Sequence, residues 1–98
     1  MVKHMIVWAF RPELEDKPAV AAQIKEALEG LVGKIEGLTE MHILTDPMDC
    51  SSGDVMMDST FVSPEALAAY QVHPLHQEIA NGIVRPAMSQ RLSFDYVV

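Results

Sequence analysis

The sequence has few of the features that mark secreted or membrane proteins. It contains one cysteine, Cys50, so no internal disulfide can form. A single thiol fits a reducing compartment, and we expect the protein to be cytoplasmic. The first apolar run, MIVWAF (residues 5–10), is six residues long and is followed by Arg11 and Pro12. That run is too short for the core of a signal peptide or for a membrane span.

Basic residues are also scarce, which limits the expected partners. There are 7 lysines and arginines against 14 aspartates and glutamates, so the formal net charge is −7. Such a surface repels phosphate groups, and we expect neither nucleic acid nor an anionic membrane as a partner. The sequence has no glycine-rich phosphate-binding loop, no HExxH motif and no paired cysteines. It therefore predicts no bound cofactor and no dedicated metal site.

Apolar residues, by contrast, are abundant. Hydrophobic residues make up 49% of the 98 residues, and charged residues make up 21%. A chain of this length is expected to fold as one small domain, residues 1–98, which buries only about 60–65% of its unfolded surface. We therefore expect apolar surface to be left over and to be covered by a second copy of the chain in a homodimer.

Four segments have the alternation typical of β-strands, namely residues 2–10, 38–45, 55–62 and 91–98. In the first segment the even-numbered residues share one face and the odd-numbered residues share the other. Both faces of the first and third segments are mainly apolar, so these strands are expected to be central and covered on both sides. In the last segment Leu92, Phe94 and Tyr96 face one way, and Arg91, Ser93 and Asp95 face the other.

Two helices are predicted between the strands. Asp16 is expected to cap the first, which has Pro18 in its first turn and ends at Gly33. Ser63 is expected to cap the second, with Pro64 at its first helical position. The polar, turn-rich segment 46–54 is predicted to be a flexible loop.

The predicted order of elements is βαββαβ, which is the ferredoxin-like arrangement of the α+β class. In that topology the first and third strands are the inner pair of one four-stranded antiparallel sheet, and both helices cover the same face. Met5 and Val7 then point away from the helices. A second sheet from a partner chain would cover them.

Four stretches of the sequence resemble the stress-responsive A/B barrel domain (Dabb) family. They occur in the family's order, together span nearly the whole chain, and are VKHMIVWAF (2–10), LVGKIEGL (31–38), SPEALAAYQVHPLH (63–76) and RLSFDYVV (91–98). Glu36 departs from the pattern, because the family often has proline there in an Ile-Pro-Gly turn. The resemblance implies a dimeric α+β barrel built from two ferredoxin-like protomers.

The resemblance also implies candidate site residues. Most of the family, especially from bacteria, has no assigned reaction, but a plant branch cyclises linear polyketides by intramolecular aldol condensation without a cofactor. That branch uses a tyrosine and a histidine of a Tyr-x-x-His-Pro-x-His stretch, which fall on Tyr70 and His76 here. The histidine of the family's first strand falls on His4. The resemblance thus implies these three residues as the catalytic set.

The chemistry of an aldol reaction suits these residue types. It needs a base that takes a proton next to a carbonyl and a donor that holds the resulting oxyanion. Neutral His76 suits the first role, because its unperturbed pKa of about 6.5 lies near working pH, and the Tyr70 hydroxyl suits the second. Since Pro74 should break the helix near His73, the two side chains could point inward from different helical segments. His4 could orient either group or the substrate.

Structural roles compete with each of these assignments. Tyr70 could pack against the sheet with its hydroxyl at the rim, and His4 could be a satisfied core histidine. His73 is expected to bond a backbone carbonyl at the helix break. A metal ion held by His73 and His76 together with His4 or an acidic residue is disfavoured, because Pro74 spoils the regular spacing of the first two.

Two functions therefore stay open at the level of the sequence. The first is a small apolar ligand pocket with Tyr70 and His76 as its polar groups, used by a cofactor-free lyase or cyclase on a carbonyl compound of polyketide type. The alternative is a non-catalytic, stress-associated dimer that binds a ligand or has a structural role. Turnover that falls when His76 is protonated would indicate the enzyme. Saturable binding without a product would indicate the alternative.

Overall fold

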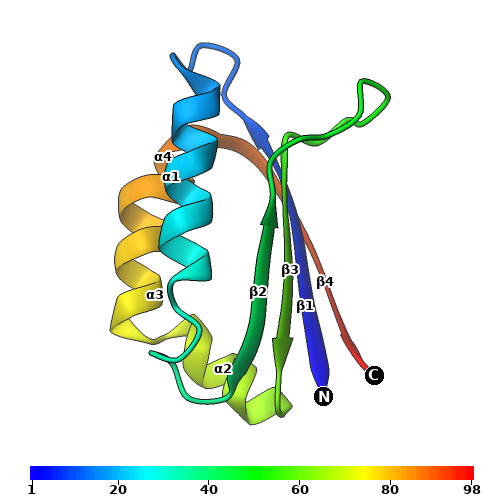
Figure 1. Cartoon of the computed structure of the whole chain (residues 1–98), viewed down its shortest axis with the longest axis vertical. Helices are drawn as coiled ribbons and strands as arrows, with labels where there is room; N and C mark the ends of the chain where they lie inside the picture. Colours follow the sequence, from blue (N-terminus) through cyan, green and yellow to red (C-terminus); the bar gives the residue numbers. More distant parts are fainter.

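The computed structural model describes residues 1–98 and contains one antiparallel sheet with helices against one of its faces (Figure 1). The strands are β1 (Val2–Phe10), β2 (Leu38–Leu44), β3 (Val55–Phe61) and β4 (Met88–Val97). Their order across the sheet is β2-β3-β1-β4, with every neighbouring pair antiparallel. β1 and β3 are therefore the inner pair, and the predicted α+β arrangement is confirmed.

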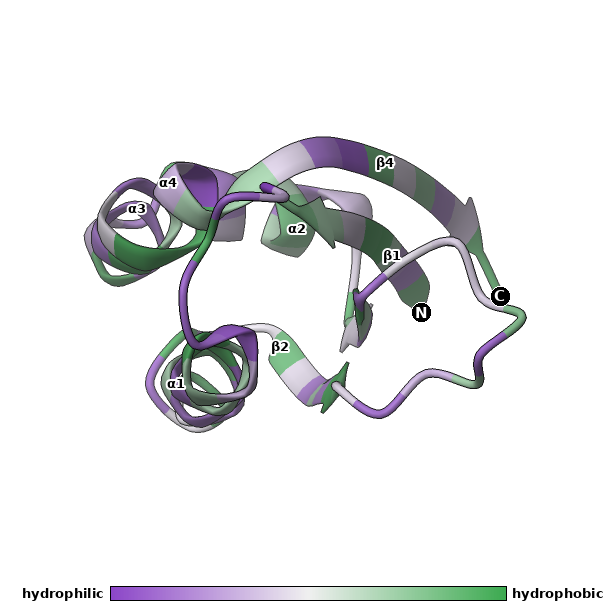
Figure 2. Ribbon diagram, turned by 90° about the horizontal axis from the view of Figure 1, so that it is seen from above, coloured by the Kyte–Doolittle hydropathy of each residue, from purple (hydrophilic) through white to green (hydrophobic).

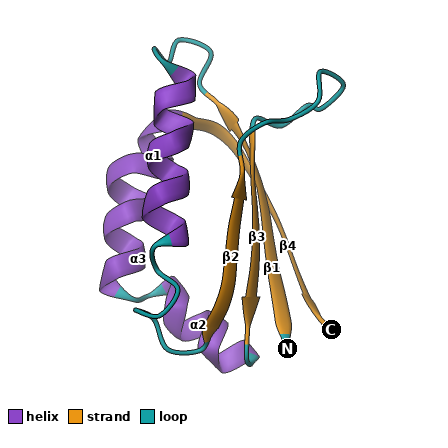
Figure 3. Ribbon diagram, viewed as in Figure 1, coloured by secondary structure: helices purple, strands orange, loops and turns teal.

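The helices form a layer beside the sheet (Figure 3). Between β1 and β2 lies α1 (Lys17–Glu29). Four consecutive helical pieces connect β3 to β4: α2 (Pro64–Gln71), α3 (Pro74–Ile79), the π-helical turn η1 (Ala80–Val84) and α4 (Arg85–Ala87). None of these helices has the length and apolar character that a bilayer-spanning segment requires.

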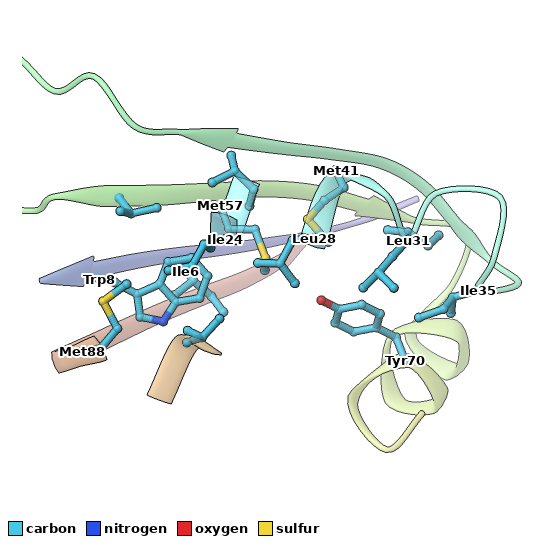
Figure 4. Packing of buried hydrophobic residues seen from close by; sticks show 14 of the residues in the cluster. Ile6, Trp8, Ile24, Leu28, Leu31, Ile35, Met41, Met57, Tyr70 and Met88 are labelled. Atoms are coloured by element: carbon cyan, nitrogen blue, oxygen red, sulfur yellow. The ribbon is translucent and has the colours of Figure 1, made fainter. Parts of the chain in front are cut away.

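The hydrophobic core lies between the sheet and this layer. The even-numbered residues of β1 are buried, as predicted, and they pack with Ile24 and Leu28 of α1 and with Tyr70 of α2 (Figure 4). Burying one large apolar side chain contributes about 1.5–3 kcal/mol. This packing fixes α2 against the sheet and so sets the position of Tyr70.

The other face of the sheet carries no helix. Figure 2 shows hydrophobic and hydrophilic residues alternating along β4. In the register of β1 and β4, Val7 lies opposite Leu92 and Met5 lies opposite Phe94. In the single chain Val7 is 38% exposed and Phe94 is 69% exposed. We call this set, Met5, Val7, Leu92 and Phe94, the open apolar face.

The loop between β2 and β3 projects from the sheet on the side away from the helices (Figure 1). Its last residue is held to β1, because the Asp54 N–H donates to Trp8 O and the Phe10 N–H donates to Asp54 Oδ2, each at 2.8 Å. Gly53 lies so close to Val7 that a Cβ atom there would clash with Val7 Cγ1. The loop therefore lies beside the open apolar face. Its predicted flexibility stays a prediction.

Three local predictions were wrong. Asp16 occupies the N-cap position of α1, but its backbone is left-handed (φ 51°) and its side chain makes no capping hydrogen bond. The first helix ends at Glu29 and not at Gly33, because successive turns follow in which Gly33 has φ 89° and reverses the chain. β4 begins at Met88, three residues earlier than predicted.

Candidate functional site

A cavity of about 70 Å³ lies between the helical layer and the β1–β4 half of the sheet. All three predicted site residues line it: Tyr70 of α2, His76 of α3 and His4 of β1. Ligand pockets for drug-sized molecules usually measure about 300–1,000 Å³. The cavity can therefore hold only a few heavy atoms, such as the reacting end of a larger molecule. The rest of its lining comprises Ile6, Trp8, Leu28, Met57, Gln71, Ala80, Val84, Arg85 and Arg91.

The break in the helix at Pro74 brings Tyr70 and His76 together. α2 ends at Gln71 and α3 begins at Pro74, as predicted. The backbone of His73 is extended (φ −67°, ψ 135°), which is the conformation that a following proline imposes. The two rings then meet from different helices, with centroids 4.2 Å apart and planes inclined by 40°.

His73 has the structural role predicted at this break, but the predicted partner was wrong. Its Nδ1 accepts a hydrogen bond from the Leu75 N–H at 3.1 Å and so caps α3, instead of bonding a carbonyl. The reason is that the first turn of α3 presents unpaired N–H groups at this point, not carbonyls. The structure contains no group of three histidine, cysteine or acidic side chains that could hold a metal ion.

Tyr70 carries a buried hydroxyl that has no hydrogen-bond partner. Figure 4 shows the hydroxyl directed from α2 into the interior toward Leu28, so the alternative with the hydroxyl at the rim does not hold. An unpaired buried hydroxyl costs about 1–3 kcal/mol, which makes it a group that needs an explanation. Burial raises the pKa of Tyr70 well above its ordinary value of about 10, against a smaller opposing effect of Arg91. The hydroxyl is therefore a protonated donor at neutral pH.

His76 is half-buried and is held in one tautomer by the end of α2. Its Nδ1 lies 3.3 Å from the backbone oxygen of Gln71. Because a carbonyl can only accept, Nδ1 carries the proton and Nε2 keeps a free lone pair. Burial lowers the pKa of His76, the bond to Gln71 opposes this, and charges on His4, Arg85 and Arg91 lower it further. At neutral pH the ring is an uncharged base.

His4 is a paired, buried residue that also lines the cavity, and its orienting role stays a prediction. It is buried, and its Nδ1 pairs with Asp95 Oδ1 across the β1–β4 register, as a satisfied core histidine should. It also lines the cavity, and its ring centroid is 6.5 Å from that of Tyr70. The aromatic rings of His4, Tyr70 and His76 thus form one wall.

Sequence reasoning gave no site role to Asp95, Arg85 or Arg91. The alternation of residues in the last strand did place Arg91 and Asp95 on one face of β4. It did not show which residue of β1 each would lie opposite. The observed register sets Asp95 opposite His4 and Arg91 opposite Trp8. Arg85 follows a π-helical turn that no pattern in the sequence indicated.

Comparison with protein families identifies one match. A family model described as Stress Responsive A/B Barrel Domain (Dabb) matches residues 2–98. No curated protein gives a significant match to the sequence. The match covers all three predicted site residues and both arginines of the cavity.

Solved structures with the same fold come from several organisms. A dimeric protein of unknown function and ferredoxin-like fold from Bacteroides fragilis has a TM-score of 0.91 and 24% identity, over 99% of this chain and 95% of that chain. A protein from Arabidopsis thaliana has a TM-score of 0.82 and 27% identity, over 100% of this chain and 95% of that chain. A hydroxynitrile lyase from Passiflora edulis has a TM-score of 0.81 and 20% identity, over 99% of this chain and 92% of that chain. These likenesses confirm the ferredoxin-like fold.

Proposed function

The chain belongs to the stress-responsive A/B barrel domain family, and we propose that it is a cofactor-free lyase or cyclase that acts next to a carbonyl group. The observation that carries the proposal is the unpaired, buried hydroxyl of Tyr70 beside the neutral ring of His76. A hydrogen-bond donor that lines a cavity and has no partner within the protein is suited to bind an oxygen atom of a substrate. A neutral imidazole at the same cavity is suited to take a proton from that substrate.

The proposed reaction uses these two groups in sequence. Nε2 of His76 takes a proton from the carbon next to the carbonyl, and the electron pair of that C–H bond forms an enolate. The Tyr70 hydroxyl donates a hydrogen bond to the enolate oxygen. The enolate carbon then attacks a second carbonyl of the same molecule, a carbon–carbon bond forms, and the imidazolium returns the proton to the new alkoxide. The reverse sequence cleaves the bond and is the lyase reaction.

His4 has a positioning role in this proposal. Its Nδ1 is engaged by Asp95, and its buried ring lies on the cavity wall with the ring of Tyr70. A fixed wall limits the orientations of a bound carbonyl, and orientation accounts for a large part of catalytic rate enhancement.

Two further features bear on the proposal. The small cavity cannot enclose a whole linear polyketide, so only the reacting end of such a substrate would enter. The Passiflora edulis protein named as a hydroxynitrile lyase has the same fold, which supports a lyase over a purely structural role.

A homodimer is the second part of the proposal. The open apolar face leaves Val7, Leu92 and Phe94 exposed in the single chain, and exposed apolar patches of this kind mark interaction sites. The similar protein from Bacteroides fragilis is described as dimeric. We propose that a second copy covers this face.

We also propose a cytoplasmic location, which the single exposed thiol of Cys50 fits.

The enzyme proposal can be tested without knowledge of the substrate. Fully deuterated acetone is small enough to probe the cavity, and loss of its deuterium to ordinary water can be followed by NMR. We expect the protein to accelerate this exchange. His76→Ala should slow it by about 10²–10⁴-fold and Tyr70→Phe by about 10²-fold. His42→Ala, an exposed histidine on β2, is the matched control and should leave the rate unchanged.

Two results would count against the proposal, one against catalysis and one against the assigned residues. Exchange no faster with the protein than in buffer, combined with saturable acetone binding, would assign the cavity to the non-catalytic alternative. Acceleration that persists in both His76→Ala and Tyr70→Phe would place the base elsewhere.

A further inference from the structure

Two unpaired arginines line the cavity. Arg85 and Arg91 account for two of only seven basic side chains in a chain of net charge −7. Lys3 and Lys25 form ion pairs with acidic residues, but neither cavity arginine does. Arg85 donates only to the neutral side chain of Asn81, and Arg91 forms no side-chain hydrogen bond. Their positive charges are therefore available to a ligand.

Arg91 reaches the cavity because of its place in the sheet. It lies opposite Trp8, on the same face of β4 as Asp95. Asp95 is the single carboxylate on that face of β4, and it pairs with His4. The positive charge of Arg91 also acts on Tyr70 and His76. It opposes the rise in the pKa of Tyr70 that burial causes, and it contributes to the lowered pKa of His76.

Arg85 reaches the cavity because of the π-helical turn. The Arg85 N–H bonds to Ala80 O, five residues earlier, and this pattern brings the two residues onto one face of the helix. Both line the cavity. π-helical turns occur frequently at functional sites. Two separate elements, β4 and α4, thus each place an arginine in the lining of the same cavity.

We propose that Arg85 and Arg91 bind a carboxylate of the substrate, so that the substrates are keto acids whose carbonyl enters the cavity. This inference rests on the function proposed above and adds the substrate class to it. A guanidinium presents paired N–H groups that match the two oxygens of a carboxylate. The cavity holds only the carbonyl end, so a carboxylate one or two carbons away would lie at its mouth. Binding there would orient the carbon between the two groups toward His76.

The test compares two probes of nearly equal shape. Acetoacetate carries a carboxylate, and acetoacetamide carries a neutral amide in its place. Trp8 is the single tryptophan and lines the cavity, so its fluorescence reports binding of either probe. We expect acetoacetate to bind about tenfold or more tightly than acetoacetamide. Arg91→Gln should weaken acetoacetate binding by about tenfold or more and leave acetoacetamide binding unchanged.

Arg11→Gln is the matched control, because it makes the same change in net charge at an arginine that is exposed like Arg91 but does not line the cavity. The Nε of Arg11 donates to Pro86 O. This variant should leave the preference for acetoacetate intact. Equal binding of the two probes, no binding of acetoacetate, or an equal loss in Arg11→Gln and Arg91→Gln would overturn the inference. Tighter binding of acetyl phosphate than of acetoacetate would overturn it too, in favour of a phosphate. The acetone exchange test needs no charged group, so it reports separately on the proposed function.

Discussion

Asp95 of β4 lies directly opposite His4 of β1, and its carboxylate pairs with the Nδ1 of the buried imidazole. The His4 side chain is 3% exposed and that of Asp95 is 42% exposed. The pair therefore joins a core group to the surface at the edge of the sheet. It orients a ring that forms part of the cavity wall.

Removal of this carboxylate should destabilise the fold. Asp95→Ala leaves a buried imidazole N–H without a partner, which costs about 1–3 kcal/mol. Asp95→Asn keeps an acceptor oxygen and should cost less. Urea unfolding of both variants measures the difference, with Ser93→Ala on the same face of β4 as the control. Equal stability of Asp95→Ala and the unchanged protein would show that the pair does not hold His4.

The two histidines around Pro74 should respond differently to truncation. His73→Ala removes the acceptor for the Leu75 N–H and so the cap of α3, which should cost about 0.5–1 kcal/mol because the bond is exposed. For a domain of this size that lowers the melting temperature by roughly 2–8 °C. His73→Asn supplies another capping acceptor and should restore most of the loss.

His76→Ala removes a half-buried ring from a cavity wall and should melt close to the unchanged protein. Thermal melts of these variants at one protein concentration make the comparison. A larger loss in His76→Ala than in His73→Ala would make His76 a structural residue of the helix corner.

Much of the fold could be predicted from the sequence because its signals are local. The Ser63–Pro64 start of α2 depends on side chains within one turn, and the Ser63 hydroxyl accepts the Ala66 N–H as expected. The break at Pro74 is a steric consequence of proline, so the approach of Tyr70 and His76 could also be anticipated. The prediction failed at Asp16 because its backbone is left-handed, whereas a capping residue typically has an extended backbone.

The rest of the site depends on contacts between distant segments. The pairing of His4 with Asp95 requires the register of β1 with β4, and alternation alone does not give a register. The cavity lining also includes Leu28 of α1 and Met57 of β3, which are brought to β1 only by tertiary packing. Arg85 reaches the cavity because a π-helical turn precedes it. Regular α-helical spacing, which is what a sequence pattern can predict, would place Arg85 on a different side of the helix.

A charge on the open apolar face should disrupt assembly. We expect the unchanged protein to sediment at micromolar concentration as a dimer, with about twice the chain mass of 10.9 kDa. Val7→Asp would place a carboxylate between the two sheets, where its desolvation is costly, and should shift the protein toward monomer. Val32→Asp is the matched control, because Val32 is 42% exposed and lies in the turn after α1, away from this face. A well-folded monomer of the unchanged protein would falsify the dimer.

The pH dependence of catalysis should identify the base. The reaction needs neutral His76, whose pKa is lowered by burial, so kcat/KM for deuterium loss from acetone should fall only below pH of about 6.5. Burial raises the pKa of Tyr70, so its hydroxyl stays a donor and no alkaline loss is expected up to about pH 10. Exchange rates measured between about pH 5 and pH 10, corrected for buffer, give the profile. A midpoint above the ordinary histidine value would assign the base to another group.

The same ionisation should appear in stability, with a sign that follows from the lowered pKa. Folded His76 prefers to be neutral, so the unfolded chain binds the proton first as the pH falls. The contribution to stability is complete above the unfolded pKa of about 6.5 and is lost as the pH falls through the lower folded pKa. His76→Gln cannot take up this proton, and its urea midpoint should therefore fall less between pH 7 and about pH 5 than that of the unchanged protein. If His76→Gln loses as much stability over this range, the acid sensitivity belongs to another group, and the tyrosine–histidine site loses its proposed base.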